Sequence, residues 1–231
     1  MVTPIEELST LPIDRDEIAF IYFGYSAVIF RTQNKTIAID MSNMSIDSEI
    51  QIKALKDLDL QFNTHTHRDH FDVATTTKIF QVSNAEIIAD LQVAKQLEGK
   101  VPTDKLYALK SGETQLINNL EIAAVRGIHP GTITLFRIKW PDFSVFHGGD
   151  SGYFSLTKYS ADLAFLPTGA PSPSCSPENA LKMALDIKPK VVVTMHGSQD
   201  QMQKFKAIAL KEIPDLNVVI PKLKEPIKIT I

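Results

Sequence analysis

The sequence contains a single cysteine, Cys175, so no disulfide bond can form within the chain. A chain without disulfides fits a reducing compartment, and we expect a cytoplasmic protein. The sequence also lacks an apolar run of about 18 residues, which a transmembrane helix requires. Its first residues lack the basic segment and the apolar segment of a secretory signal peptide. We therefore expect neither export nor a membrane partner.

An excess of basic charge is also absent. The 24 Lys and Arg residues are outnumbered by 27 Asp and Glu residues, which gives a net charge of -3. A nucleic-acid groove usually carries the opposite balance, so nucleic acid is not the expected partner. We expect a small-molecule substrate, and the sequence leaves open whether the chain forms a homo-oligomer.

Linkers and internal repeats are missing as well. No shift in composition separates two parts of the 231 residues. Two-layer folds often reach about 250 residues as a single unit. We therefore expect residues 1–231 to form one domain.

The apolar pattern predicts many short strands with helices between them. The expected strands cover residues 18–23, 27–31, 36–39, 58–62, 86–89, 105–109, 114–117, 120–125, 132–139, 143–146, 163–166, 191–195 and 218–220. The expected helices cover residues 46–57, 73–83, 91–97, 176–187 and 200–212. The first three strands suggest an antiparallel meander. Runs of strands with interspersed helices predict an α/β (α+β) fold, a four-layer αββα sandwich of two mixed β-sheets flanked by helices.

The most informative stretch is Thr-His-Thr-His-Arg-Asp-His-Phe-Asp, residues 64–72, which follows an expected buried strand. Side chains two apart in an extended loop point the same way, so His65 and His67 can grip one ion together. Asp69 and His70 follow and can face a second position. Imidazole and carboxylate ligands suit zinc, manganese or iron. A polar loop with capping residues would not need four ligand-type side chains within six residues.

Three further ligand candidates lie at the ends of expected strands, where a sheet can present side chains from loops. His129 and His196 each follow a strand and stand next to a glycine or Pro-Gly turn. Alone, each would more often be a surface or core residue, but the histidine-rich stretch still needs ligands. Asp150 lies in a glycine-rich turn. It either caps its own turn or bridges two metals about 3.5–4 Å apart.

Five other residues have two readings each or no clear role. Asp40 either accepts a hydrogen bond from a ligand His or from loop backbone, or is a solvated turn residue. Arg68 either meets an anionic substrate or lies on the surface, and Tyr25 is either a donor in a cleft or a core aromatic. His147 is expected to be structural or to support a ligand. Cys175 has no activating neighbour, so we do not expect a nucleophile.

Taken together, these residues resemble the metallo-β-lactamase superfamily of binuclear metallohydrolases, in order and in approximate spacing over most of the chain. The resemblance is strongest to the branch of ascorbate-6-phosphate lactonase-like and uncharacterised metal-dependent hydrolases. The matching residues are His65, His67, Asp69, His70, His129, Asp150 and His196, with Phe23–Ser26, Thr36–Asp40, Gly149–Gly152, Ala161–Pro167 and Met195–Gly197 in support.

The resemblance implies a metallo-β-lactamase-like fold and two metal positions. One would be held by His65, His67 and His129, and the other by Asp69, His70 and His196, with Asp150 between them. Relatives in this branch often carry His in place of Tyr25, so the resemblance assigns that position no role. It assigns none to the Pro/Ser-rich loop at residues 171–176.

Such a centre predicts a hydrolase that cleaves a small ester, lactone or phosphodiester. Two dications lower the pKa of a shared water, and the resulting bridging hydroxide is the expected nucleophile. Asp69 can orient this group and accept its proton, which makes it the expected catalytic residue. We expect two divalent metal ions, zinc first, with manganese and iron left open.

Three alternatives remain at this stage. A metal-dependent nuclease of the same fold is the first, although the acidic balance argues against it. A redox protein with two irons is the second, but such members typically carry Glu where His67 stands. A binding scaffold without catalysis is the third, and the complete ligand set argues against it.

Overall fold

The computed structural model describes residues 2–46 and 48–231. These residues divide into two compact units. The first unit comprises the described residues up to Leu109 together with Lys222–Thr230, and the second comprises Lys110–Pro221 with Ile231. Each unit has its own seven-stranded sheet.

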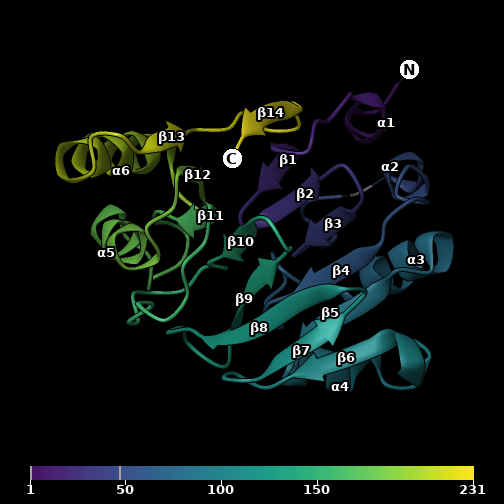
Figure 1. The fold of residues 1–231 in the computed structure, drawn as a ribbon. Coiled ribbons are helices and arrows are strands. Elements are labelled where there is room, and N and C mark those ends of the chain that lie inside the picture. The colour runs from purple at the N-terminus through teal and green to yellow at the C-terminus, as the bar shows by residue number, and fades with distance from the viewer. Residues whose placement is uncertain (1, 47) are drawn as a thin grey trace. The chain divides into compact units, whose positions relative to one another are not determined.

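The sheet of the first unit has the strand order β14-β1-β2-β3-β4-β5-β6. Its strands are β1 (Glu17–Gly24), β2 (Ala27–Arg31), β3 (Thr36–Ile39), β4 (Leu60–Asn63), β5 (Glu86–Asp90), β6 (Leu106–Leu109) and β14 (Ile227–Thr230). The pairs from β14 to β3 are antiparallel and those from β3 to β6 are parallel. The predicted antiparallel meander of β1, β2 and β3 is therefore confirmed. β14 lies beside β1 although the two are far apart in the chain (Figure 1).

Helices cover one face of this sheet. They are α1 (Pro4–Thr10), α2 (Glu49–Lys53), α3 (Val73–Ser83) and α4 (Leu91–Leu97), and a 3₁₀ turn, η1, covers Thr103–Lys105. One buried cluster joins Leu8 of α1 and Ile79 of α3 to Ile29 and Ala38 of the sheet. β4 is buried along its whole length. The loop that follows β4 is therefore anchored at its start by a fully buried strand.

The sheet of the second unit has the strand order β13-β12-β11-β10-β9-β8-β7. Its strands are β7 (Thr114–Ile117), β8 (Leu120–Arg126), β9 (Thr134–Lys139), β10 (Ser144–His147), β11 (Leu163–Pro167), β12 (Val191–Met195) and β13 (Asn217–Val219). The pairs from β7 to β10 are antiparallel and those from β10 to β13 are parallel. This sheet is therefore mixed in the same way as the first.

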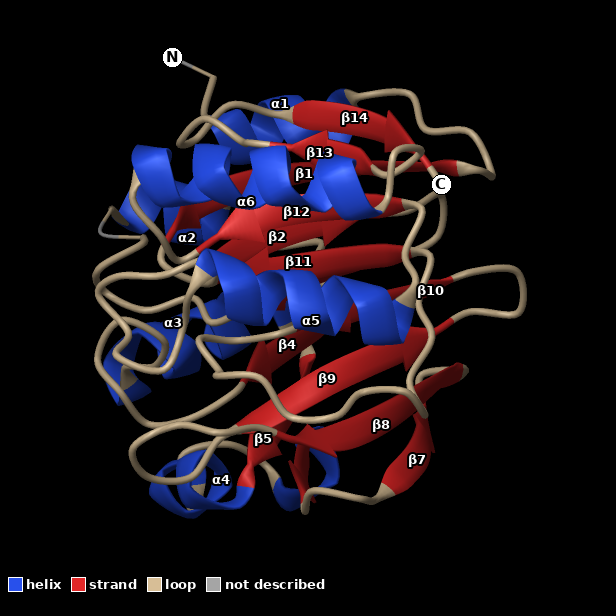
Figure 2. Ribbon diagram, turned by 90° about the vertical axis from the view of Figure 1, so that its left-hand side faces the viewer, coloured by secondary structure: helices blue, strands red, loops and turns tan. Residues whose placement is uncertain are grey.

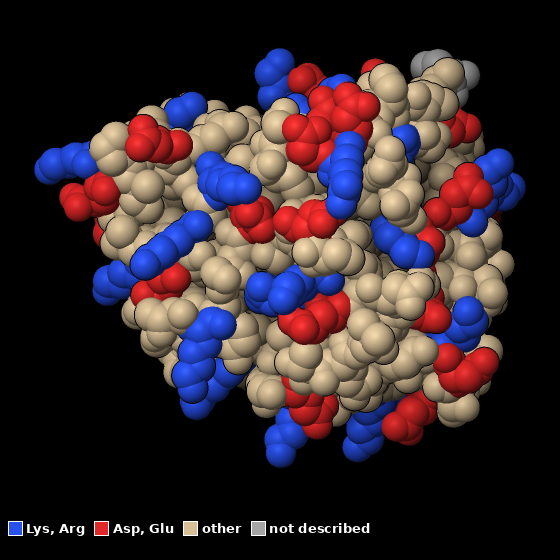
Figure 3. Space-filling view, in the orientation of Figure 1, with Lys and Arg blue, Asp and Glu red and all other residues tan. Residues whose placement is uncertain are grey.

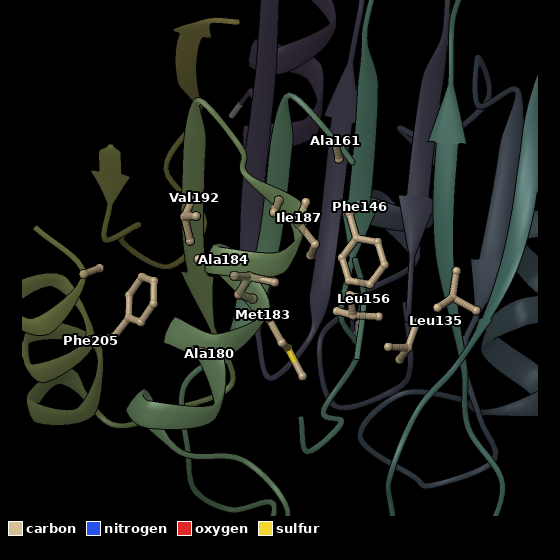
Figure 4. Close-up of a cluster of buried hydrophobic side chains, with 14 of the residues drawn as sticks. Leu135, Phe146, Leu156, Ala161, Ala180, Met183, Ala184, Ile187, Val192 and Phe205 are labelled. Atoms are coloured by element: carbon tan, nitrogen blue, oxygen red, sulfur yellow. The ribbon is translucent and has the colours of Figure 1, made fainter. Parts of the chain in front are cut away.

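Two helices, α5 (Pro177–Ile187) and α6 (Gln199–Glu212), cover the parallel strands of this sheet (Figure 2). Met183 and Ile187 of α5 share a buried cluster with Phe146 and Leu135 of the strands (Figure 4). The predicted start of α5 is confirmed, since the Ser176 hydroxyl accepts a hydrogen bond from the backbone N–H of Asn179 at 3.1 Å.

The predicted fold class is confirmed, because the described residues form two mixed sheets flanked by helices. That residues 1–231 act as one domain stays a prediction. No helix in the part of the chain that the structure describes has the length and apolar character needed to cross a membrane.

The expected helix at residues 46–57 is wrong in its extent. α2 begins after Ser48, whose hydroxyl accepts a hydrogen bond from the backbone N–H of Gln51 at 3.2 Å, and it ends at Lys53. Residue 47 lies outside the described residues. Three elements, α1, η1 and β14, were not predicted. Other boundaries differ by one or two residues, as helix and strand ends commonly do.

Candidate functional site

Three imidazoles gather in the loop that follows β4. A turn closes this loop, because the backbone N–H of His70 donates to the carbonyl of His67 at 3.0 Å. The ring centroid of His65 lies 4.6 Å from that of His67 and 4.2 Å from that of His70. His65 and His70 are buried, whereas His67 is exposed. With Asp69, these residues are called the first-unit set.

Asp40 holds this loop from the adjacent strand. It follows β3, the parallel neighbour of β4, and its φ of 54° is in the left-handed region, which is uncommon outside glycine. Its Oδ1 accepts from the backbone N–H of Thr64 at 2.8 Å. Its Oδ2 accepts from the Thr64 hydroxyl and from Nδ1 of His70, each at 2.8 Å. One buried carboxylate thus ties together both ends of the loop.

These contacts set the tautomers of two imidazoles. An ionised carboxylate only accepts hydrogen bonds, so His70 carries a proton on Nδ1. The Thr64 hydroxyl donates its hydrogen bond to Asp40, and it therefore accepts from Nδ1 of His65, 3.0 Å away. Both rings present the lone pair of Nε2 as a ligand atom. Metal-binding histidines are commonly held in this way by a partner on the other ring nitrogen.

Asp69 reaches the same place as His70. Its Oδ2 lies 3.3 Å from Nε2 of His70, and its side chain keeps 22% of its surface exposed. A carboxylate in this position can bind a metal ion together with the lone pair of the imidazole, and it can still exchange a proton with solvent.

The second unit gathers the other three predicted ligands, called the second-unit set. Oδ2 of Asp150 lies 2.8 Å from Nε2 of His129 and 3.9 Å from Nε2 of His196. The three side chains are at most 4% exposed. They follow β8, β10 and β12, so strand ends present them as the sequence predicts. The carboxylate oxygen is flanked by two imidazole nitrogens.

His196 is held by the loop that follows β11. Its φ of 43° is left-handed, and its Nδ1 lies 3.3 Å from the carbonyl oxygen of Gly169. Because a carbonyl only accepts, the proton is on Nδ1, and Nε2 presents its lone pair. Gly197 allows the close turn, since a Cβ there would lie 2.2 Å from Oγ1 of Thr168.

His147 supports the turn that carries Asp150. Its ring is fully buried, and Nδ1 accepts a hydrogen bond from the backbone N–H of Gly149 at 3.3 Å. Gly149 has a φ of 54°, where glycine is least strained. This contact agrees with the structural reading of His147.

The remaining candidates differ in their surroundings. Tyr25 lies half-buried in the turn between β1 and β2, where its carbonyl accepts from the Tyr22 hydroxyl at 3.1 Å. Arg68 is exposed within the histidine loop. Burial raises the pKa of the Cys175 thiol to about 12, so the group is protonated near neutral pH. That agrees with the expectation that Cys175 is not a nucleophile.

The donor atoms of the two sets fit divalent metal ions. Each of the seven predicted ligands belongs to a group of His and Asp side chains that could hold a metal ion. Neutral imidazoles with an anchored Nδ1–H and nearby carboxylates are ligands that zinc, manganese and iron accept. The supporting residues Thr64 and Gly169 carry no distinctive signal in the sequence. They act through local contacts that no spacing rule reveals.

Comparisons with known proteins agree with this fold. Residues 19–196 match the model of the β-lactamase superfamily domain. A metal-dependent hydrolase from Caldivirga maquilingensis is 27% identical over 90% of this chain and 98% of its own length. One from Geobacillus is 30% identical over 76% of this chain and 83% of its own. The structure of Igni18, a metallo hydrolase from Ignicoccus hospitalis, has a TM-score of 0.77 and 23% identity, and covers 93% of this chain and 99% of that one. The chain therefore belongs to the metallo-β-lactamase superfamily, among the members that are named metal-dependent hydrolases.

Proposed function

We propose that the chain is a binuclear metal-dependent hydrolase that cleaves a small ester, lactone or phosphodiester. In this proposal His65, His67 and His129 serve one ion, Asp69, His70 and His196 serve the other, and Asp150 bridges them. The metal-dependent hydrolases among its relatives support the reaction class. We propose zinc as the native metal, with manganese and iron as alternatives.

The anchoring of the imidazoles is the observation that carries this proposal. Nδ1 of His65, His70 and His196 each faces an oxygen acceptor, so each ring directs Nε2 away from its anchor. Burying several histidines and carboxylates together is costly unless they are paired or coordinate a metal. A metal site explains why one fold keeps two such sets.

Divalent ions bound here would supply a water of lowered pKa and would polarise the oxygen of the attacked bond. The chain's own contribution is positioning and proton transfer. In this proposal Asp69, whose side chain remains partly exposed, accepts a proton during the reaction and passes it to solvent. Asp40 accepts a hydrogen bond from Nδ1 of His70, and this contact holds the ring in one tautomer.

We propose a small-molecule substrate, because the net charge of -3 does not favour a polyanion such as a nucleic acid. On the face drawn in Figure 3, basic and acidic side chains are interspersed. A protein that follows a nucleic-acid backbone instead gathers basic residues along one stripe. The exposed Arg68 stands within the histidine loop and could attract an anionic group of the substrate.

Elemental analysis and a substrate panel test this proposal. The protein is purified without chelator or nickel, and we expect about two equivalents of zinc, manganese or iron per chain. The loaded protein is then assayed on chromogenic esters, lactones and phosphodiesters. Asp69→Asn should lower the rate on the best substrate by about 100-fold or more, because the amide cannot accept the proton. Asp142→Asn, in an exposed turn, is the matched control and should act like the parent.

Two results would contradict the proposal. One is a protein that holds no metal as purified and takes up none on soaking. The other is an Asp69→Asn variant that retains the full rate with the metal content of the parent.

A further inference from the structure

The loop between β11 and α5, residues 168–176, contacts two of the second-unit ligands and includes the Pro/Ser-rich loop at residues 171–176. Near its start, Gly169 is tied to His196 twice. The backbone N–H of Gly169 donates to the carbonyl of His196 at 2.8 Å, and its own carbonyl lies 3.3 Å from Nδ1 of that ring. The first half of the loop therefore fixes the orientation of His196.

The second half of the loop converges on the main chain of Asp150. The Ser172 hydroxyl donates to the carbonyl oxygen of Asp150 at 2.9 Å. The Cys175 thiol donates to the same oxygen at 2.8 Å. A carbonyl oxygen has two lone pairs, so the two side chains fill the capacity of this acceptor.

The other side of this turn is tied to the strand end that carries His129. The backbone N–H of Ile128 donates to the Ser151 hydroxyl at 2.7 Å. The backbone N–H of Gly152 donates to the carbonyl of Ile128, also at 2.7 Å. Ser151 and Gly152 are thus held by Ile128 in the segment after β8, while the carbonyl of Asp150 itself is held by the loop.

Asp150 needs such support because its turn is built from glycines. Gly148 and Gly149 precede it directly, and Gly149 has a φ of 54°. Glycine restricts the backbone less than any other residue, so it does not by itself fix the direction of the carboxylate that follows. Donors that fix the carbonyl of Asp150 also limit rotation about its backbone. They thereby keep Oδ2 between His129 and His196.

We propose that Ser172 and Cys175 are positioning residues for metal binding, which hold the Asp150 carbonyl so that the carboxylate meets His129 and His196 in a fixed orientation. This inference rests on the proposed metal centre. It gives the Pro/Ser-rich loop a role, and it assigns Cys175 a hydrogen-bonding role in place of a chemical one.

Metal titration of the parent and three variants tests this inference. Zinc affinity is measured by competition with a chromophoric chelator in the parent, Ser172→Ala/Cys175→Ala, Ser172→Ala/Cys175→Ser and Ser174→Ala. The double alanine variant should bind at least one zinc ion about 10–100-fold more weakly, which is the usual effect of removing a group that supports a ligand. Cys175→Ser keeps a donor and should restore part of that loss. Ser174→Ala, in the same loop, should match the parent.

Two further measurements separate positioning from general stability. The thermal midpoint of the metal-free proteins should be similar in the parent and the three variants, whereas the visible spectrum of bound cobalt(II) should change most in the double alanine variant. Equal zinc affinity in the parent and the double alanine variant would overturn the positioning role and leave the metal centre intact. A loss of affinity that follows a collapse of the metal-free midpoint, without rescue by serine, would also overturn it. A parent that binds no metal would instead remove the proposed function.

Discussion

The histidine loop is held in place mainly by the carboxylate of Asp40. This carboxylate accepts three hydrogen bonds, two of them on Oδ2. In Asp40→Asn, an amide nitrogen would replace one of these oxygens and could not accept. We expect metal affinity to fall about 10–100-fold and the free energy of unfolding to fall by about 1–3 kcal/mol.

Zinc titration and urea unfolding measure the two effects of Asp40→Asn. Asp57→Asn is the control, since Asp57 is exposed and is not part of the histidine loop. Unchanged zinc affinity in Asp40→Asn would show that this network serves the fold alone.

Gln61 on β4 is a buried amide within an apolar sheet. Its side chain is fully buried, and among the described residues neither its Nε2 nor its Oε1 has a hydrogen-bond partner. An unsatisfied buried polar group costs about 1–3 kcal/mol. Gln61→Met keeps a similar shape, so it should raise the free energy of unfolding by about 1 kcal/mol. A destabilised variant would reveal a buried water that serves the amide.

Urea unfolding also measures this change. Gln96→Met, on the exposed side of α4, is the control and should lie within about 0.5 kcal/mol of the parent.

At the residue scale, the supporting contacts of Asp40 with a candidate ligand and with loop backbone could be predicted, but those of Thr64 could not. The sequence singles out His65, His67, Asp69 and His70, because four residues that can ligate a metal lie within six positions. Thr64 is as important to the geometry of this loop, yet a threonine beside a histidine carries no distinctive pattern. Its role depends on Asp40, which follows the neighbouring strand β3 in a left-handed conformation. Only folding brings these two residues together.

Among the elements, α1 depends on one side chain from β2. The guanidinium of Arg31 donates to the carbonyls of Leu8, Ser9 and Leu11 at the C-terminal end of this helix. A cation at this end also interacts favourably with the helix dipole. Arg31→Met should lower the free energy of unfolding by about 2–3 kcal/mol, because it leaves partly buried carbonyls without a charged donor.

Two readouts follow this loss. Urea unfolding gives the free energy, and limited proteolysis reports opening of the segment from residue 10 to residue 16. Arg31→Lys keeps the charge with fewer donors and should fall between the parent and Arg31→Met. If Arg31→Met is as stable and as resistant as the parent, the packing of Ile5 and Leu8 alone holds α1.

The missed elements have different physical reasons. α1 begins with a capping box of Thr3 and Glu6 around Pro4, a local signal that the sequence does contain. β14 has no such signal, because half of its residues are exposed and it gains its strand partner from β1, over 200 residues away. Helices with strong local signals, such as α3 and α5, were predicted almost to the residue.

For the whole chain, the two sheets follow one plan. Each combines three antiparallel pairs with three parallel pairs, and loops after the parallel strands carry His65, Asp150 and His196. Most of the elements and their types followed from the hydrophobic pattern, with α1, η1 and β14 as the exceptions. The strand order did not, because pairing depends on contacts between distant segments.

If both ligand sets bind metal, bound metal should stabilise the folded chain. Substitution of a ligand in either set should then abolish most of this stabilisation. Free zinc at about 100 times its dissociation constant would stabilise the folded state by about 2.7 kcal/mol. For a chain of this length that raises the thermal midpoint by roughly 5–10 °C over the chelator-treated protein. Scanning calorimetry with and without zinc measures this shift. His65→Ala and His129→Ala, one from each set, should each lose most of it, while Asp142→Asn keeps it. A full shift in His129→Ala would show that only the first-unit set binds metal, and the bridging role proposed for Asp150 would then be wrong.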